Sequence, residues 1–153
     1  MKMNRYEELY RTILLEHEQV FAAQDMAALS AAIEEIAAAG RIFVIGAGRE
    51  GIAARGFAMR LMHLGKEVHW LWDDTTPGMH GGDLFLAVNG SGCIGHIDYL
   101  LDQARTTGVR QLVITGAPHE RTPAMADVCL FVPAMVYKGT DPRTIRTASL
   151  PTV

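Results

Sequence analysis

Five short apolar runs recur between residues 41 and 133, and stretches with helical spacing separate them. The runs contain few polar alternations, which is typical of strands covered on both faces. They are RIFVIG (Arg41–Gly46), EVHWLW (Glu67–Trp72), DLFLAVN (Asp83–Asn89), QLVITG (Gln111–Gly116) and VCLFVP (Val128–Pro133). The alternation predicts an α/β fold with a parallel, doubly wound, five-stranded sheet between two layers of helices.

Helices are predicted before the first strand and between later strands. Residues 6–39 are rich in Ala, Leu, Glu and Gln, with Asp25 as the expected N-cap of a second helix and Gly40 as its C′ glycine. Crossover helices are expected to stop at Gly65 and Gly108. We predict one domain over residues 1–153, with a helical N-terminal segment (1–40), a sheet core (41–134) and an irregular tail (135–153).

Composition and charge narrow the class of protein. Of the 153 residues, 49% are hydrophobic and 20% are charged, and the net charge is −3, so neither disorder nor a nucleic-acid-binding surface is indicated. No apolar run approaches the roughly 20 residues of a membrane span. Cys93 and Cys129 form no zinc or redox spacing, so free thiols are expected. We expect a cytoplasmic protein that binds neither nucleic acid nor membrane.

The first glycine-rich turn, VIGAGREG (Val44–Gly51), follows the first predicted strand. Gly46, Gly48 and Gly51 reproduce the spacing of a dinucleotide-binding turn, in which glycines allow a tight turn, an approach to pyrophosphate and close helix packing. One interpretation is therefore a nucleotide site, with an aspartate after the second strand on a ribose hydroxyl. The motif alone is a weak signal.

A second glycine loop, NGSG (Asn89–Gly92), follows the third predicted strand. It is expected to open a helix, which would place Ser91 and several backbone N–H groups at a helix N-terminus that suits a phosphate. Ligands of such sheets bind at the carboxyl ends of the strands. Two glycine loops at that edge favour a small anionic ligand held between them.

Four segments resemble SIS (sugar isomerase) domains, and within that family the 6-phospho-3-hexuloisomerases most of all. They are GFAMRLMHLG (56–65), TTP (75–77), GDLFLAVNGSG (82–92) and ADVCLFVPA (126–134). The resemblance implies a flavodoxin-like five-stranded sheet and a sugar or sugar phosphate as ligand. It also implies no metal or cofactor, and an active site shared between subunits of a homodimer or homotetramer.

The chain departs from the family pattern where hydroxyl groups hold the phosphate. Glu50 stands in place of the first serine, Asn89 in place of the second, and Ile94 in place of a threonine, whereas Ser91 is kept. A carboxylate within about 4 Å of a phosphate costs several kcal/mol at an effective dielectric near 20. Unless Arg49 is engaged with it, Glu50 therefore disfavours a phosphate here.

The C-terminal residues depart from the family as well. SIS isomerases are expected to continue into a long helix that covers the sheet and carries the carboxylate and histidine that move the proton. Residues 137–153 (YKGTDPRTIRTASLPTV) contain neither a helical apolar stripe nor a glutamate. One face of the sheet is then expected to need another cover, and dimerisation through that face is the expected remedy.

Isomerisation through an enediol needs a base that carries a proton near neutral pH, so histidine or a desolvated glutamate is sought. Glu50, His63, His80 and His96 are the candidates, and His63 and His96 are the predicted catalytic residues. The resemblance places the helix of His63 at the subunit contact, and His96 follows the second glycine loop. Predicted ligand-binding residues are Gly46, Gly48, Arg49, Glu50, Thr75, Thr76, Asn89, Ser91, Gly92 and Cys93.

Three functions follow from these features. The leading hypothesis is a phosphosugar isomerase that interconverts a 3-ketohexose phosphate and its 2-keto isomer. The second is a non-catalytic sugar-binding or phosphosugar-binding regulatory SIS module, which the missing hydroxyls favour. The third is a nucleotide-dependent α/β enzyme. For Cys93, no Asp or His partner at fixed spacing supports a nucleophile, so a packed thiol is favoured over a reactive one.

Overall fold

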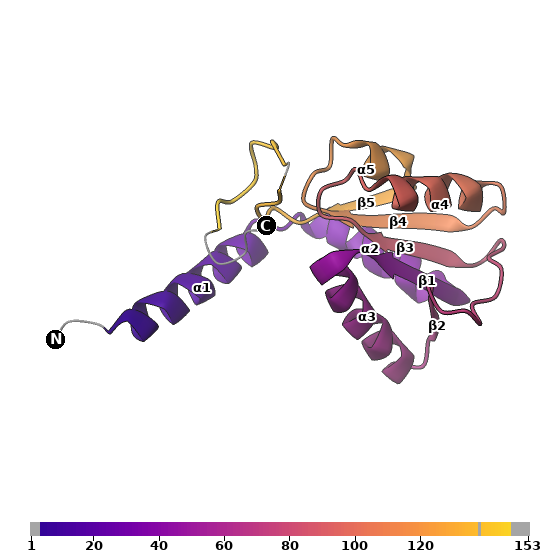
Figure 1. The fold of residues 1–153 in the computed structure, drawn as a ribbon, viewed down its shortest axis with the longest axis horizontal. Helices are drawn as coiled ribbons and strands as arrows, with labels where there is room; N and C mark the ends of the chain where they lie inside the picture. The colour runs from indigo at the N-terminus through magenta and orange to yellow at the C-terminus, as the bar shows by residue number, and fades with distance from the viewer. Residues whose placement is uncertain (1–3, 138, 148–153) are drawn as a thin grey trace.

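The sheet of this protein has five parallel strands (Figure 1). The structure is a computed structural model that describes residues 4–137 and 139–147. The strands are β1 (Arg41–Gly46), β2 (Glu67–Trp70), β3 (Leu84–Val88), β4 (Arg110–Thr115) and β5 (Val128–Phe131). Their order, β2-β1-β3-β4-β5, is the flavodoxin-like order and confirms the predicted fold class. In this order the carboxyl ends of β1 and β3 are neighbours, paired through Gly46 and Val88.

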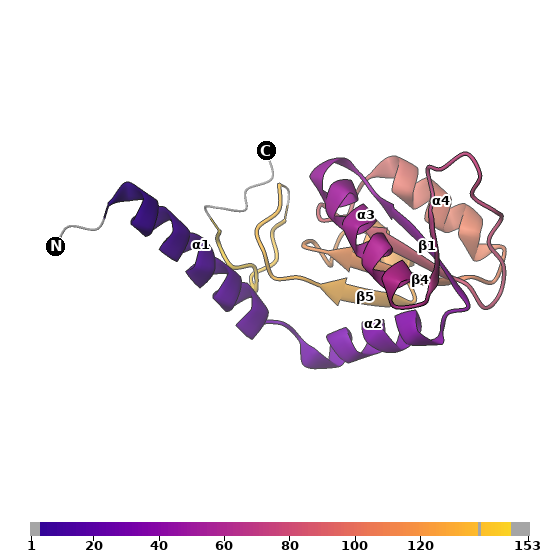
Figure 2. The same ribbon diagram turned by 90° about the horizontal axis from the view of Figure 1, so that it is seen from below.

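Helices cover both faces of the sheet (Figure 2). The helices of the described residues are α1 (Arg5–Ala22), α2 (Met26–Ala38), α3 (Gly48–His63), α4 (Gly95–Arg105) and α5 (Arg121–Met125). Of these, α2 to α5 cover the sheet. Successive side chains of a strand point to opposite faces. Ile42 and Val44 therefore pack against α2 and α3, whereas Phe43 and Ile45 pack against α4.

Part of the sheet face that was expected to need another cover is covered by α2. Ala32 of α2 is buried in the same cluster as Leu130 of β5, and Leu29 and Ile36 pack against that cluster. The predicted N-terminal helical segment therefore supplies part of this cover, and an apolar cavity remains at Val88, Ile114 and Val132. Sequence reasoning missed this because an alanine-rich helix does not reveal which face of a sheet it will cover.

Predicted helix boundaries are mostly confirmed. Asp25 caps α2, since its Oδ1 accepts hydrogen bonds from the N–H groups of Ala27 (2.8 Å) and Ala28 (3.1 Å). Gly65 and Gly108 have φ of +86° and +75°, as expected of glycines that follow helices. Gly40 does follow the C-cap of α2, but its φ is not positive, because the chain passes directly into β1.

α1 extends away from the sheet (Figures 1 and 2). It begins at Asn4, whose Oδ1 accepts a hydrogen bond from the N–H of Glu7. Of its residues, Glu16 and Val20 are buried. Both views place residues after β5 beside the C-terminal half of this helix. The rest of α1 keeps a long apolar surface in solvent.

Two glycines set the distance between β1 and α3. A Cβ on Gly51 would lie 2.7 Å from the carbonyl oxygen of Gly46, and a Cβ on Gly46 would lie 2.9 Å from the Cα of Gly51. Neither neighbour can yield, since both are backbone atoms. The first turn of α3 can therefore approach the end of β1 only because both residues lack side chains.

This close contact predicts opposite effects for two glycine substitutions in one helix. Gly51→Ala should lower the free energy of unfolding by about 2 kcal/mol, because its new methyl group overlaps backbone. Gly56→Ala, where a Cβ meets nothing within 4 Å, should raise it by about 1 kcal/mol through helix propensity. Urea unfolding of both variants measures the difference, and equal effects would contradict the steric argument.

Candidate functional site

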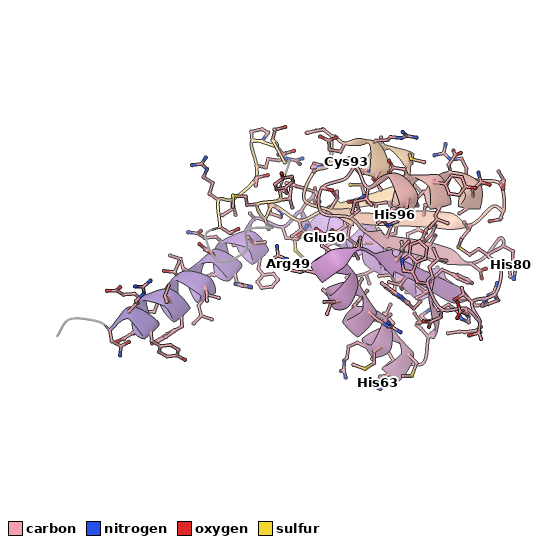
Figure 3. All side chains as sticks on the ribbon, viewed as in Figure 1. Arg49, Glu50, His63, His80, Cys93 and His96 are labelled. Atoms are coloured by element: carbon pink, nitrogen blue, oxygen red, sulfur yellow. The ribbon has the colours of Figure 1, made fainter. Side chains whose placement is uncertain are left out.

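A cavity of about 400 Å³ opens at the carboxyl edge of the sheet, between the start of α3 and the loop that follows β3. The two predicted glycine loops therefore meet at one cavity. Figure 3 shows Arg49 and Glu50 on the first turn of α3, at the end of that helix nearest β1. The described lining residues are Ala47, Gly48, Arg49, Glu50, Ser91, Ile94 and Tyr137.

The first loop owes its shape to its glycines. Gly46 ends β1, Ala47 precedes α3 without a side-chain cap, and Gly48 has a φ of +56° that favours glycine. A Cβ on Gly48 would meet nothing within 4 Å, so its backbone conformation, not crowding, explains this glycine. The backbone of the loop is thus open to the cavity.

Glu50 joins the two loops. Its Oε2 accepts a hydrogen bond from the N–H of Gly90 at 2.8 Å. The carboxylate therefore takes a backbone donor of the second loop, a group that a bound anion would otherwise use. Behind Glu50 lies a second, apolar cavity of about 170 Å³, lined by Val88, Ile114, Val132 and Val136 among others.

The second loop differs from its prediction. α4 begins at Gly95 with Ile94 as its N-cap, so Ser91 is not a helix cap and Cys93 precedes the helix. Asn89 closes a tight turn instead, because its Oδ1 accepts hydrogen bonds from the Gly92 N–H (3.1 Å) and from the Ser91 hydroxyl (3.2 Å). Gly92 completes the turn with a φ of +67°.

The residues of this loop lie at different depths. Asn89 is fully buried and Gly92 is buried, whereas Ser91 is half-buried and lines the cavity. Cys93 is exposed, with its Sγ 3.8 Å from the Ser91 hydroxyl oxygen. Of the residues predicted here, Ser91 is the one whose side chain reaches the cavity.

The histidines predicted as proton carriers lie apart from one another. His63 is exposed at the C-terminal end of α3, about 20 Å along the helix from Glu50. His96 is exposed on the first turn of α4, where its ring packs against Trp72 with centroids 5.7 Å apart. The cavity lining has no histidine among its described residues.

His80 lies at the opposite edge of the sheet, before β3 (Figure 3). Its Nε2 is 2.6 Å from the guanidinium of Arg41, the first residue of β1. Arg41 also pairs with the buried Asp83 at 2.6 Å. Burial would raise the pKa of Asp83, but the hydrogen bonds from Arg41 and from the His80 N–H outweigh it and lower that pKa. This cluster joins the amino ends of β1 and β3, and the structure does not bring His80 to the cavity.

Thr75 and Thr76 belong to the loop after β2. The hydroxyl of Thr76 donates a hydrogen bond to the Trp70 carbonyl at 2.8 Å, and Thr75 is exposed. Neither threonine is among the described residues of the cavity lining. β2 is an edge strand, which keeps this loop on the far side of β1 from the second glycine loop.

Tyr137 is a lining residue that sequence reasoning missed. It belongs to the predicted tail, which is irregular over residues 135–137 and 139–147, and the last six residues of the chain lie outside the described ones. The tail is held by one isolated pairing of Ala134 with Ile145 and by Asp141. No helical pattern marks residues 135–147, so the sequence carried no signal that this segment would reach the site.

Asp141 is the polar centre of this tail. Its carboxylate is buried and lies 2.7 Å from the guanidinium of Arg143 and 2.9 Å from the ring of His119. Arg143 in turn lies over the ring of Phe131 in β5, 4.4 Å from its centroid. The hydrogen bond from Arg143 holds the pKa of Asp141 well below its usual range, although burial acts in the opposite direction.

We predict that Asp141→Asn lowers the stability of the protein in a pH-dependent way. Because the native pKa is lowered, the carboxylate stabilises the fold above its unfolded pKa of about 3.9, and this stabilisation is lost as pH falls toward the native pKa. The urea midpoints of wild type and variant should therefore differ at pH 7 and converge in acid. Asp102→Asn, at an exposed aspartate of α4, is the control. A pH-independent difference would contradict the ion-pair explanation.

No helix among residues 4–137 and 139–147 is long and apolar enough to cross a membrane. Over the same residues, no three His, Cys, Asp or Glu side chains gather closely enough to hold a metal ion.

A flavodoxin-like sheet with two glycine loops around one cavity defines a class of α/β proteins that bind small ligands at the strand ends. The family model of the SIS domain matches residues 35–148. The chain therefore belongs to the SIS domain family. The match includes β1 to β5, both glycine loops and all of the described tail.

Several known proteins resemble this chain. The 3-hexulose-6-phosphate isomerase of Mycobacterium gastri is 40% identical over 100 residues, which cover 65% of this chain and 50% of that protein. The enzyme of the same name from Methylomonas aminofaciens is 37% identical over 95 residues, covering 62% of this chain and 52% of that protein. The chain thus spans about half the length of the curated relatives it matches.

A solved structure supports the same relationship. It is a hypothetical protein from Methanococcus jannaschii, for which a molecular function of 3-hexulose-6-phosphate isomerase has been inferred. The two structures superpose with a TM-score of 0.75 at 27% sequence identity, over 86% of this chain and 76% of that one. The likeness in fold therefore extends over most of the chain.

Proposed function

We propose that this chain is a phosphosugar isomerase-like SIS protein that interconverts 3-hexulose 6-phosphate and fructose 6-phosphate. The observation that carries the proposal is the cavity of about 400 Å³ between the two glycine loops, at the strand ends of a SIS domain. The two relatives named 3-hexulose-6-phosphate isomerase supply the substrate class. The match to the SIS family model, over residues 35–148, includes both loops.

The reaction needs one proton carrier and a place for the phosphate. A base removes the proton from C2 of the 3-hexulose while the C3 carbonyl oxygen takes up a proton, which gives a 2,3-enediol. The first proton then returns to C3 while the O2 hydroxyl loses its proton, which leaves a carbonyl at C2. Glu50 is the one carboxylate among the described residues that line the cavity. We assign it the contact with the sugar, and we assign the phosphate to the backbone of Gly48 and the side chains of Arg49 and Ser91. The predicted roles of His63 and His96 then need a neighbouring subunit or a movement of the loops.

The contact of Glu50 with Gly90 favours a second candidate function. A carboxylate that accepts the loop's own N–H repels a phosphate close by, and one held on Gly90 is not free to act as the base. The second candidate is therefore a sugar-binding or phosphosugar-binding regulatory SIS module. Both functions use the same cavity, and they differ in whether the bound sugar reacts.

We predict that Glu50→Ser and Glu50→Gln bind fructose 6-phosphate at least about tenfold more tightly than wild type, because each removes a negative charge beside the phosphate. Affinity for free fructose should change much less, which makes this neutral sugar the matched control. Isothermal titration measures both. If neither variant gains affinity for the phosphate ester, the electrostatic argument is wrong.

A coupled assay for fructose 6-phosphate then separates the two candidates. If the protein is an isomerase with Glu50 as its base, wild type turns over 3-hexulose 6-phosphate and Glu50→Gln binds it without turnover. Binding without turnover in wild type and variants alike would support the regulatory module. Stabilisation by NAD alone in a thermal-shift panel would overturn both and favour the nucleotide hypothesis.

We also propose that the protein is a homo-oligomer and that a second copy covers α1. Several large apolar residues of this helix are exposed, among them Tyr6, Leu9, Leu14 and Phe21. Exposed apolar residues gathered on one helix are typical of a protein–protein contact. Its partner surface is proposed to be α3, which exposes Ile52 and Met59 around Gly56. The opposite net charges of the two helices support this pairing, since α1 is acidic and α3 is basic.

This proposal predicts that Leu14→Glu reduces the size of the assembly, because a charge would enter the buried interface. Light scattering coupled to size-exclusion chromatography measures the mass of each species. Tyr99→Glu, at an exposed tyrosine of α4, is the control and should leave the mass unchanged. A wild-type chain that stays monomeric at every concentration would contradict the proposal.

The cytoplasmic location stays a prediction, consistent with two free cysteines.

A further inference from the structure

Three buried side chains form a chain of hydrogen bonds behind the second glycine loop. The Asn89 Nδ2 donates to the Thr122 hydroxyl at 2.8 Å, and that hydroxyl donates to Asp98 Oδ1 at 2.5 Å. Asn89 and Thr122 are fully buried, and Asp98 is 4% exposed. The chain joins the loop after β3 to α4 and to α5, which are distant in sequence.

The direction of these hydrogen bonds is fixed by chemistry. An ionised carboxylate only accepts, so the Thr122 hydroxyl donates to Asp98 and is left to accept from its other neighbour. Asn89 must therefore turn its amide nitrogen toward Thr122. Its Oδ1 then faces the loop, where it accepts from Ser91 and Gly92. Asp98 thus determines the orientation of an amide that it does not touch.

Thr122 also makes a backbone hydrogen bond to the loop. Its N–H donates to the carbonyl of Gly92 at 2.7 Å. Gly92 fits tightly beneath the segment that leads to α5, since a Cβ there would lie 2.8 Å from the Ala117 carbonyl oxygen. Main-chain and side-chain contacts of one residue therefore hold both ends of the Asn89–Gly92 turn.

We propose that Thr122 and Asp98 are positioning residues for the ligand loop. Through Asn89 they hold the Ser91 hydroxyl, the group of this loop that we assign to the phosphate, in its place beside the cavity. The ligand part of this inference rests on the proposed function, whereas the loop geometry does not. Polarisation along such a chain strengthens each bond, so removal of one hydroxyl disturbs the whole turn.

The test compares Thr122→Val, which removes the hydroxyl at nearly constant shape, with Thr122→Ser, which keeps it. Thr122→Val should weaken the binding of fructose 6-phosphate about tenfold, and Thr122→Ser should stay near wild type. Thr107→Val is the matched control, because Thr107 makes a local hydrogen bond to the Ala104 carbonyl at the end of α4. It should lower stability without changing affinity.

Asp98→Asn tests the directional argument, because an amide can donate to Thr122 and allow the Asn89 amide to reverse. The amide NMR signals of Gly90, Ser91 and Gly92 in the ligand-free protein should shift in Thr122→Val and Asp98→Asn, and not in Thr107→Val. Unshifted signals in folded Thr122→Val would overturn the positioning role. If the signals shift but wild type binds no sugar phosphate, the proposed function fails and the positioning role stands.

Discussion

The structure of the site depends on the backbone contact between Gly46 and Gly51. Because neither residue has a side chain, the first turn of α3 lies directly against the end of β1. Glu50 is thereby brought within hydrogen-bonding distance of Gly90, whose strand is the neighbour of β1 in the sheet. The same contact places Arg49 at the mouth of the cavity. A larger residue at either glycine would separate α3 from β1 and open the space that defines the site.

The two loops use different means to present a ligand surface. The first offers open backbone, because Gly48 adopts a left-handed conformation without crowding. The second is fixed by buried side chains, because Asn89 donates a hydrogen bond to Thr122, which in turn donates one to Asp98. Between them, Glu50 supplies a negative charge where other SIS domains are expected to supply a hydroxyl. In the function that we propose, this carboxylate serves the reaction where it faces the sugar and limits phosphate binding where it stays on Gly90.

Much of the fold could be predicted from the sequence, and the errors have specific causes. The five apolar runs identified all five strands. The central strands β1, β3 and β4 are mostly buried and have little polar alternation, and the edge strands β2 and β5 are still largely apolar although less buried. The start of α4 was placed too early, since Ser91 between glycines has the composition of a helix cap, and the Asn89 side chain competes for the same N–H groups. The cover provided by α2 and the approach of Tyr137 were missed, because each depends on contacts between segments far apart in sequence.

The sequence by itself determined the class of fold, the family resemblance and the two glycine loops that border the cavity. Those features are local, because strand periodicity and glycine spacing need no knowledge of distant residues. Tertiary structure alone decided which side chains meet. It joined Glu50 to Gly90, separated His63 and His80 from the cavity, and linked Asn89 to Asp98 through Thr122. The physical reason is that hydrogen bonds and electrostatic contacts act over a few ångströms, and only the packing of the helices on the sheet sets those distances.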